Sequence, residues 1–205
     1  MFNIYTVLFI ILGYLIGSIP WALVIGKVFY NTDVRNYGSG NLGGSNVLRT
    51  LGKVPGIAVM VLDGLKCLVY MVILHLIGQD AIMPIAGLFV CVGHCYPIFA
   101  GFKGGKAVAS SVGYVLALNI FIEHQIIVAW LVPMLIFLII LKLDGRMAVS
   151  SITAQVLFSV TAWITYTNKL NALFVTLLAI YIIYKHKANI QRILNGTEGK
   201  LKAKK

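Results

Sequence analysis

Long apolar runs recur from one end of this chain to the other, and they limit its fold more than any other feature. The first 26 residues contain no charged side chain. A helix needs about 20 apolar residues to cross the hydrocarbon core of a membrane. Hydrophobic residues make up 60% of the chain and charged residues only 11%, less than half the share found in water-soluble domains. The sequence therefore predicts an all-α, polytopic transmembrane helix bundle.

Polar stretches divide the apolar sequence into seven segments, which we interpret as seven transmembrane spans. The first is longer than the apolar region of a secretory signal and lacks its basic start, so we expect it to be retained. No soluble domain, low-complexity segment or repeat interrupts the pattern, which predicts one membrane-embedded domain over residues 1–205. The predicted spans are residues 4–25, 54–77, 81–100, 107–122, 125–141, 147–165 and 170–184. The polar loops are 27–53, 101–106 and 142–146, and the tail is 185–205.

Positive charge is distributed unevenly between the two sides that seven spans define. Of the 17 lysines and arginines, all but Lys66 and Lys169 fall in the three polar loops and the tail, which lie on one side. Because cytoplasmic loops carry an excess of Lys and Arg, we expect the N-terminus outside and the tail in the cytoplasm. This topology explains the net charge of +11 better than nucleic-acid binding does, so we expect no nucleic-acid partner.

Two lysines enclose two glycines after the third predicted span, in the sequence Lys103-Gly104-Gly105-Lys106. Glycine allows close backbone approach, and a helix that begins near Lys106 would direct N–H groups and its positive dipole end into the bend. This predicts a phosphate or carboxylate site at the membrane surface. A nucleotide P-loop is excluded because the glycine spacing is one residue short and Ala107 replaces the required Ser or Thr. Taken alone, the stretch also fits a basic turn that only follows the charge rule.

Two further polar stretches lie on the same predicted side. In residues 38–49, glycines alternate with hydrogen-bonding side chains, and Arg49 adds donors that fit phosphate oxygens, which favours a binding loop over a flexible linker. In the tail, His186, Asn189 and Arg192 would share one helix face, where the histidine could accept a proton or donate to phosphate. An interfacial anchor explains that face equally well. The candidate residues of the first stretch are Ser39, Asn41, Ser45, Asn46 and Arg49.

Charged and metal-binding residue types also occur inside the apolar runs. Asp63 and Lys66 lie three residues apart, and because a lone charge in a membrane costs about 2.5–3.5 kcal/mol, we expect an ion pair that supports the site structurally. Cys91, His94 and Cys95 would share one helix face but have no fourth ligand nearby, so we interpret them as packing residues. We expect no metal and no cofactor.

The three stretches together resemble the bacterial membrane-integral acyl-phosphate:glycerol-3-phosphate acyltransferases. The resemblance covers almost the whole chain and lies in residues 17–20, 38–49, 93–106, 186–192 and 196–198, with the Asp63–Lys66 pair. Four positions depart from the family's pattern: Gly44 and Ser45 stand where Ala and Thr are usual, Tyr96 replaces Phe, and Ala107 replaces a common glycine. A family pattern around residues 146–151 is blurred, so Ser150 and Ser151 receive no role.

The resemblance implies a role for each matching residue. Catalytic roles are expected for Ser39, Arg49, His186 and Asn189. Substrate-binding roles are expected for Asn41, Ser45, Asn46, Lys103, Gly104, Gly105 and Lys106, with the phosphate of glycerol 3-phosphate on the glycines and Lys106. Structural roles are expected for Asp63, Lys66 and Glu198.

The reaction that the resemblance implies is transfer of a fatty acyl group from acyl phosphate, rather than acyl-CoA or acyl carrier protein, to glycerol 3-phosphate. The expected partners are these two substrates, membrane lipid and the soluble enzyme that makes acyl phosphate. The expected location is the bacterial cytoplasmic membrane, with the three stretches in one pocket facing the cytoplasm. A phosphate or organic-phosphate transporter is the main alternative, because charged residues within spans would also serve transport. A membrane scaffold with a basic tail is a third.

Overall fold

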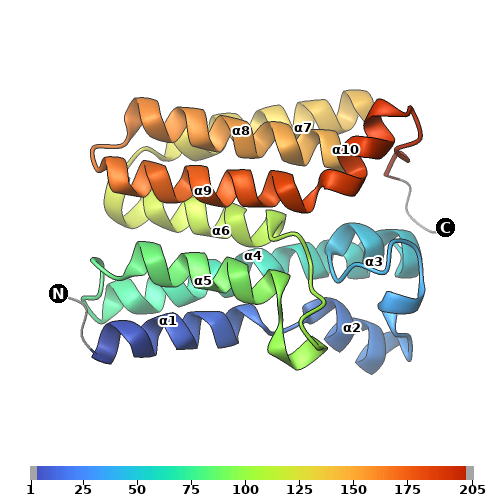
Figure 1. Ribbon diagram of the computed structural model, residues 1–205, viewed down its shortest axis with the longest axis horizontal. Helices are drawn as coiled ribbons and strands as arrows, with labels where there is room; N and C mark the ends of the chain where they lie inside the picture. Colours follow the sequence, from blue (N-terminus) through green and yellow to red (C-terminus); the bar gives the residue numbers. More distant parts are fainter. Residues whose placement is uncertain (1–3, 202–205) are drawn as a thin grey trace. The chain divides into compact units, whose positions relative to one another are not determined.

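A computed structural model describes residues 4–201 of the chain, and this part contains helices but no strands (Figure 1). The all-α prediction is therefore confirmed for the described residues. The α-helices are α1 (Ile4–Gly17), α2 (Trp21–Tyr30), α3 (Gly44–Leu51), α4 (Lys53–Leu76), α5 (Met83–Cys95), α6 (Val108–Leu118), α7 (Val132–Asp144), α8 (Met147–Thr165), α9 (Lys169–Lys185) and α10 (Lys187–Leu194). Short 3-10 helices η1 (Val34–Asn36) and η2 (Ile98–Ala100) and π-helical turns η3 (Asn119–Glu123) and η4 (Ile127–Leu131) complete the set.

Five helical segments among the described residues are long and apolar enough to cross a membrane. They match the first, second, third, fifth and sixth predicted spans and are Ile4–Tyr30, Lys53–Leu76, Met83–Ala100, Ile127–Asp144 and Met147–Thr165. A sixth forms if α9 and α10, which meet at a bend of 59°, count as one broken span. The predicted fourth span corresponds to the shorter apolar helix Val108–Glu123. The chain is thus a multi-pass membrane protein, and the count of seven remains a prediction.

The first predicted span is not one continuous helix. It is divided between α1 and α2 by the segment 18–20, which ends in Pro20. Proline has no backbone N–H and its ring clashes with the preceding turn, so it favours a helix start over a helix interior. The break leaves the carbonyl of Ile19 available, and the Nζ of Lys66 donates to it at 3.1 Å.

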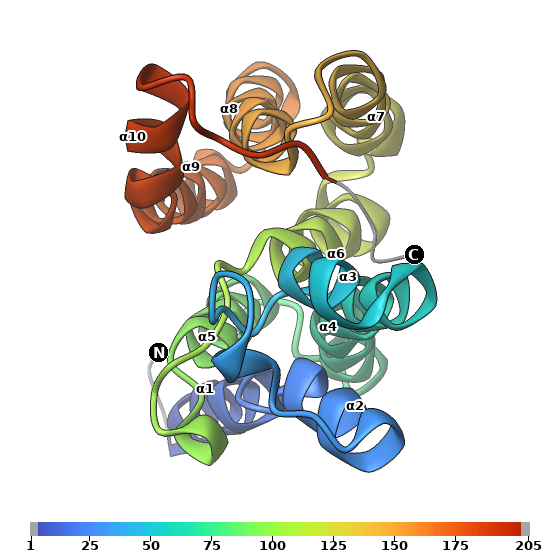
Figure 2. The same cartoon turned by 90° about the vertical axis from the view of Figure 1, so that its right-hand side faces the viewer.

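The described chain divides into two compact units, residues 4–114 and residues 115–201. In the first unit, α1, α4 and α5 pack side by side (Figure 2). The α1–α5 contact depends on glycine: a Cβ at Gly13 would lie 2.6 Å from the carbonyl oxygen of Ala86, and one at Gly17 or Gly93 would overlap the opposite backbone. Small residues let membrane helices approach at backbone distance, where dispersion forces replace the hydrophobic effect.

In the second unit, α8 packs against both α7 and α9. A buried acid, Glu123, ties η3 to the start of α9. Its carboxylate accepts hydrogen bonds from the Nδ2 of Asn171 at 2.7 Å and from the backbone N–H of Thr167 at 3.0 Å. The tail returns to the α7–α8 turn, where the N–H of Leu201 donates to the carbonyl of Gly145 at 2.7 Å. These contacts fix both ends of α9 and its extension within this unit.

Candidate active site

The loop that carries Ser39, residues 33–43, is organised around the side chain of Asn46. Asn46 is only 1% exposed, and its Nδ2 donates to the carbonyls of Val34 at 3.0 Å and Tyr37 at 3.2 Å. Its Oδ1 accepts the backbone N–H of Ser39 at 2.9 Å. Gly38 has a φ of 59° and lies against the same Oδ1, so a side chain there would be strained and would collide. The amide of Asn46 is therefore engaged by the loop itself.

The other predicted residues of this stretch lie around Asn46 with more solvent contact. Ser39 is exposed, while Asn41, Ser45 and Arg49 are partly buried, the latter two on α3. A surface pair lies at the start of the loop, in which the guanidinium of Arg35 is 2.6 Å from the carboxylate of Asp33. The hydrogen bonds from Arg35 hold the pKa of Asp33 well below its usual range. Asp33 therefore stays charged at neutral pH.

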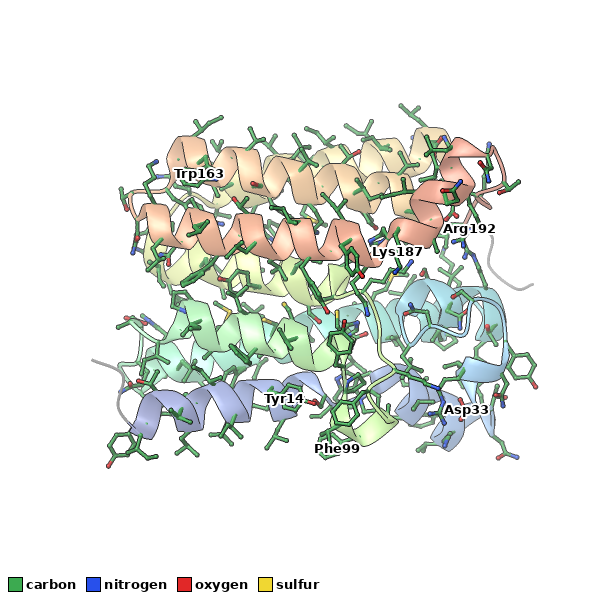
Figure 3. All side chains as sticks on the ribbon, in the orientation of Figure 1. Tyr14, Asp33, Phe99, Trp163, Lys187 and Arg192 are labelled. Atoms are coloured by element: carbon green, nitrogen blue, oxygen red, sulfur yellow. The ribbon has the colours of Figure 1, made fainter. Side chains whose placement is uncertain are left out.

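The glycine loop, residues 101–107, follows η2, whose last residue belongs to the same hydrophobic cluster as the Ser39 loop. Ala100, just before it, shares this cluster with Val34, Leu42 and Val47. The hydroxyl of Tyr14 donates to the carbonyl of Tyr96 at 2.9 Å and holds α1 to the entry of the loop (Figure 3). The structure thus brings the first two predicted stretches together within the first unit.

The backbone of the glycine loop differs from the expected anion seat. The N–H of Gly104 donates to the carbonyl of Cys95 at 3.2 Å, and the N–H of Gly105 donates to the carbonyl of His94 at 3.0 Å. These two donors are already used within the protein, and substrate binding at Gly104 and Gly105 stays a prediction. Both glycines instead allow close packing, because a Cβ at either would overlap atoms of His94. The cationic groups of the loop are those of the exposed Lys103 and the partly buried Lys106.

Ala107 ends this loop in a conformation that alanine rarely adopts, with a φ of 59° and no exposed surface. Because a Cβ in the left-handed region costs roughly 1–2 kcal/mol, the glycine expected here from the family pattern has a physical basis. We predict that Ala107→Gly raises the free energy of unfolding by up to about 1 kcal/mol, part of the gain being lost to unfolded-chain entropy. The measurement is the thermal midpoint in detergent. A lower midpoint than that of the unmodified protein would contradict the assignment.

A buried ionic cluster lies directly behind the glycine loop. The Nζ of Lys66 lies 2.9 Å from the carboxylate of Asp63, as the sequence predicts for a membrane ion pair. The Nδ1 of His94 joins them, 3.0 Å from Lys66 and 3.3 Å from Asp63. The interpretation of His94 as a packing residue like the neighbouring cysteines is therefore wrong. The sequence signal that points to it is the Gly93-His94 pair, which opens the stretch 93–106.

The third predicted stretch belongs to the second unit and forms the bend between α9 and α10. His186 sits at the bend, 3% exposed, and its Nδ1 lies 2.8 Å from the carbonyl of Ile182. Because a carbonyl only accepts, Nδ1 carries the proton, and in the neutral ring the lone pair belongs to Nε2. The ring therefore has the tautomer that a proton acceptor at Nε2 requires.

The buried carboxylate of Glu198 fixes the orientation of the residues that follow on α10. It accepts hydrogen bonds from the Nδ2 of Asn189 at 2.8 Å and the Nε of Arg192 at 2.7 Å. This pairing with Arg192 agrees with the structural role expected for Glu198. The amide of Asn189 is thereby held in one orientation, with its Oδ1 directed away from the acid. Lys187 and Arg192 both belong to this short helix (Figure 3).

The chain is similar to proteins of one family over nearly its whole length. A family model described as Glycerol-3-phosphate acyltransferase matches residues 7–196. A glycerol-3-phosphate acyltransferase of Geobacillus kaustophilus is 41% identical over 198 residues, 96% of each chain. One of Bacillus subtilis is 42% identical over 195 residues, 95% of this chain and 97% of its own.

Solved structures agree with the sequence comparison. The crystal structure of PlsY, an integral membrane glycerol 3-phosphate acyltransferase, in its glycerol 3-phosphate form superimposes with a TM-score of 0.85 at 34% identity, covering 97% of this chain and 96% of that one. Its lysophosphatidic acid form gives a TM-score of 0.83 at 33% identity, over 96% and 95% of the two chains. With the family model matched from the first span to the tail, this chain belongs to the glycerol-3-phosphate acyltransferase family.

Proposed function

We propose that this protein transfers a fatty acyl group from acyl phosphate to the 1-hydroxyl of glycerol 3-phosphate, giving lysophosphatidic acid and phosphate. The observation that carries the proposal is the agreement, over 97% of the chain, with a PlsY structure in its glycerol 3-phosphate form. The local geometry supports it, because the Ser39 loop and Ala100, which directly precedes the glycine loop, share one hydrophobic cluster in the first unit, and the two stretches carry cationic and hydroxyl side chains. The reaction is a step of phospholipid synthesis.

In this proposal the substrate phosphates are held by side chains rather than by the N–H groups of Gly104 and Gly105. Lys103, Lys106 and the guanidinium of Arg49 supply positive charge, and Arg49 fits two phosphate oxygens at once. Ser39 adds a hydroxyl, with Asn41 and Ser45 as further polar contacts. Fixed positive charge also stabilises the leaving phosphate as its bond to the acyl carbon breaks.

The acyl transfer itself needs one proton acceptor and no cofactor. The 1-hydroxyl oxygen attacks the acyl carbon, the bond from that carbon to the phosphate oxygen breaks, and the hydroxyl proton moves to a base. We assign the base to Nε2 of His186, whose tautomer suits it. Asn189, oriented by Glu198, supports this step.

Direct attack on acyl phosphate predicts that no acyl-enzyme accumulates. Acyl phosphate is already an activated donor, and the three cysteines are buried in α4 and α5. Purified protein incubated with radiolabelled acyl phosphate and no acceptor should retain no label after denaturation. Label that stays bound and is released by hydroxylamine would contradict direct attack.

We also propose that the chain crosses the bacterial cytoplasmic membrane seven times, with the N-terminus outside and the site open to the cytoplasm. The charge distribution supports this orientation. A soluble enzyme that makes acyl phosphate would then meet the protein on that side. A Lys187→Cys variant should react with a membrane-impermeant maleimide in inside-out vesicles and not in intact spheroplasts, since Lys187 is exposed and the three native cysteines are buried. The reverse pattern would contradict the orientation.

The function is tested in proteoliposomes given labelled glycerol 3-phosphate. An acyltransferase forms labelled lysophosphatidic acid when acyl phosphate is added and retains no label in the vesicle lumen without it. Accumulation of unchanged glycerol 3-phosphate inside the vesicles would instead identify a transporter. Absence of both product and uptake would leave the scaffold function.

A further inference from the structure

The buried ionic cluster of Asp63, Lys66 and His94 lies where α4 meets the segment 18–20, α5 and the start of α6. Lys66 donates to the carbonyl of Ile19, in the break between α1 and α2, at 3.1 Å. The hydroxyl of Ser110, on the first turn of α6, donates to the backbone carbonyl of Asp63 at 3.0 Å. The cluster therefore connects α4 to the two helices that flank the loop and to the broken first span.

The contact from this cluster to the loop is made by the imidazole of His94. A Cβ built on Gly105 would overlap the Nε2 of that ring and lie 2.8 Å from its Cε1 and 2.9 Å from its Cδ2. All three nearest atoms belong to the His94 side chain, so the ring lies flush against the Gly105 backbone. The opposite edge of the same ring carries Nδ1, which faces Lys66 and Asp63.

Gly104 makes a different contact, which serves as a reference. A Cβ there would overlap the backbone carbonyl oxygen of His94 and lie 2.5 Å from the Cδ of Pro97 and 2.8 Å from the carbonyl oxygen of Cys95. Two of these atoms are backbone and the third is part of a proline ring. The closest contacts of Gly104 therefore come from backbone and Pro97, while the closest contacts of Gly105 all come from the His94 side chain.

We propose that His94, held by the Asp63–Lys66 pair, is a positioning residue. Its ring sets the distance between the glycine loop and the buried ionic cluster and, through the position of the loop, the affinity for the phosphate of glycerol 3-phosphate. The inference rests on the proposed function for its substrate. His94 acts through the Gly105 backbone and needs no contact with the substrate. A buried ion pair suits this purpose because it holds the ring in one orientation, and charges of this kind in a membrane are retained for a function.

The experiment is a double-mutant cycle on the full-length protein in detergent, with the KM for glycerol 3-phosphate and kcat as readouts. His94→Asn keeps a polar group at the position of Nδ1 and removes the ring edge under Gly105. Alone it should raise KM by at least about fivefold with less than a twofold change in kcat, and Gly105→Ala should raise KM by a similar or larger factor. In the Gly105→Ala background, His94→Asn should lower KM, because it removes the atoms with which the new Cβ collides.

The matched control is the same cycle with Gly104→Ala, in which His94→Asn should give no relief. The proposal would be overturned if His94→Asn changed KM by the same factor in the unmodified and Gly105→Ala backgrounds. It would also be overturned if His94→Asn lowered KM in the Gly104→Ala background. If Gly105→Ala folds poorly, the thermal midpoint replaces KM as the readout of the cycle. The midpoint of the double variant should then be higher than that of Gly105→Ala alone, and additive changes in the midpoint would overturn the proposal. If the unmodified protein forms no product, that result contradicts the proposed function and not the role of His94.

Discussion

Replacing Arg49 by alanine should lower kcat/KM for glycerol 3-phosphate by at least about a hundredfold, the size of effect seen when a group that stabilises transition-state charge is removed. Arg49 lies on α3, two turns after the Ser39 loop, and is partly buried. Both substrates of the proposed reaction are phosphates, so a positioned guanidinium would contribute to binding and to the departure of the leaving group. The protein should remain monodisperse in detergent. The measurement is the rate of lysophosphatidic acid formation by the purified variant.

Arg35→Ala is the matched control for this prediction. Arg35 belongs to the same polar stretch but is occupied by its surface pair with Asp33. Exposed pairs of this kind contribute about 0–1 kcal/mol, so this variant should keep nearly full activity. Near-normal turnover by Arg49→Ala, or an equal loss in both variants, would contradict the role given to Arg49.

The second large effect is expected for Asn46→Asp. The amide of Asn46 donates to the carbonyls of Val34 and Tyr37, and a carboxylate would place negative charge 3.0 and 3.2 Å from those oxygens. An unpaired buried donor or acceptor costs about 1–3 kcal/mol, and more for charged groups, so the loop should lose its shape. We expect kcat to fall about a hundredfold or more, because Ser39 is then no longer held.

Asn36→Asp makes the same chemical change at an exposed position of the same stretch and should leave the rate almost unchanged. If Asn46→Asp raised KM and left kcat unchanged, the result would support the direct substrate contact that the sequence predicts for Asn46, and not a role in holding the loop. Asn46→Ala separates the two effects further, since it removes the amide without adding charge.

The sequence was sufficient for the fold class and for most of the span positions, because both follow from apolar length. It did not reveal the division of the first span at residues 18–20 or the bend of 59° after α9. Hydropathy does not detect such breaks, since apolar residues continue through them. Pro20 is a sequence signal of the first break, because proline favours a helix start over a helix interior.

For the candidate site, the sequence indicates which residue types are present but not which groups they contact. Spacing and composition select two polar stretches, and the structure places residues of both in one hydrophobic cluster. They could not assign the N–H groups of Gly104 and Gly105 to the carbonyls of Cys95 and His94, because those bonds depend on how α5 ends. They also could not separate Asn46, which is enclosed by backbone, from the more accessible Asn41. His94 lies 28 residues from Lys66, and only folding shows that they meet.

The most direct measurement is an acyl-donor comparison with purified protein and labelled glycerol 3-phosphate. Acyl phosphate, acyl-CoA and acyl carrier protein loaded with the same fatty acid are supplied separately, and labelled lysophosphatidic acid is quantified. We predict that product forms with acyl phosphate alone and that one inorganic phosphate is released for each acyl group transferred. Product formed from acyl-CoA or acyl carrier protein at a comparable rate, or no product with acyl phosphate, would contradict the proposed function.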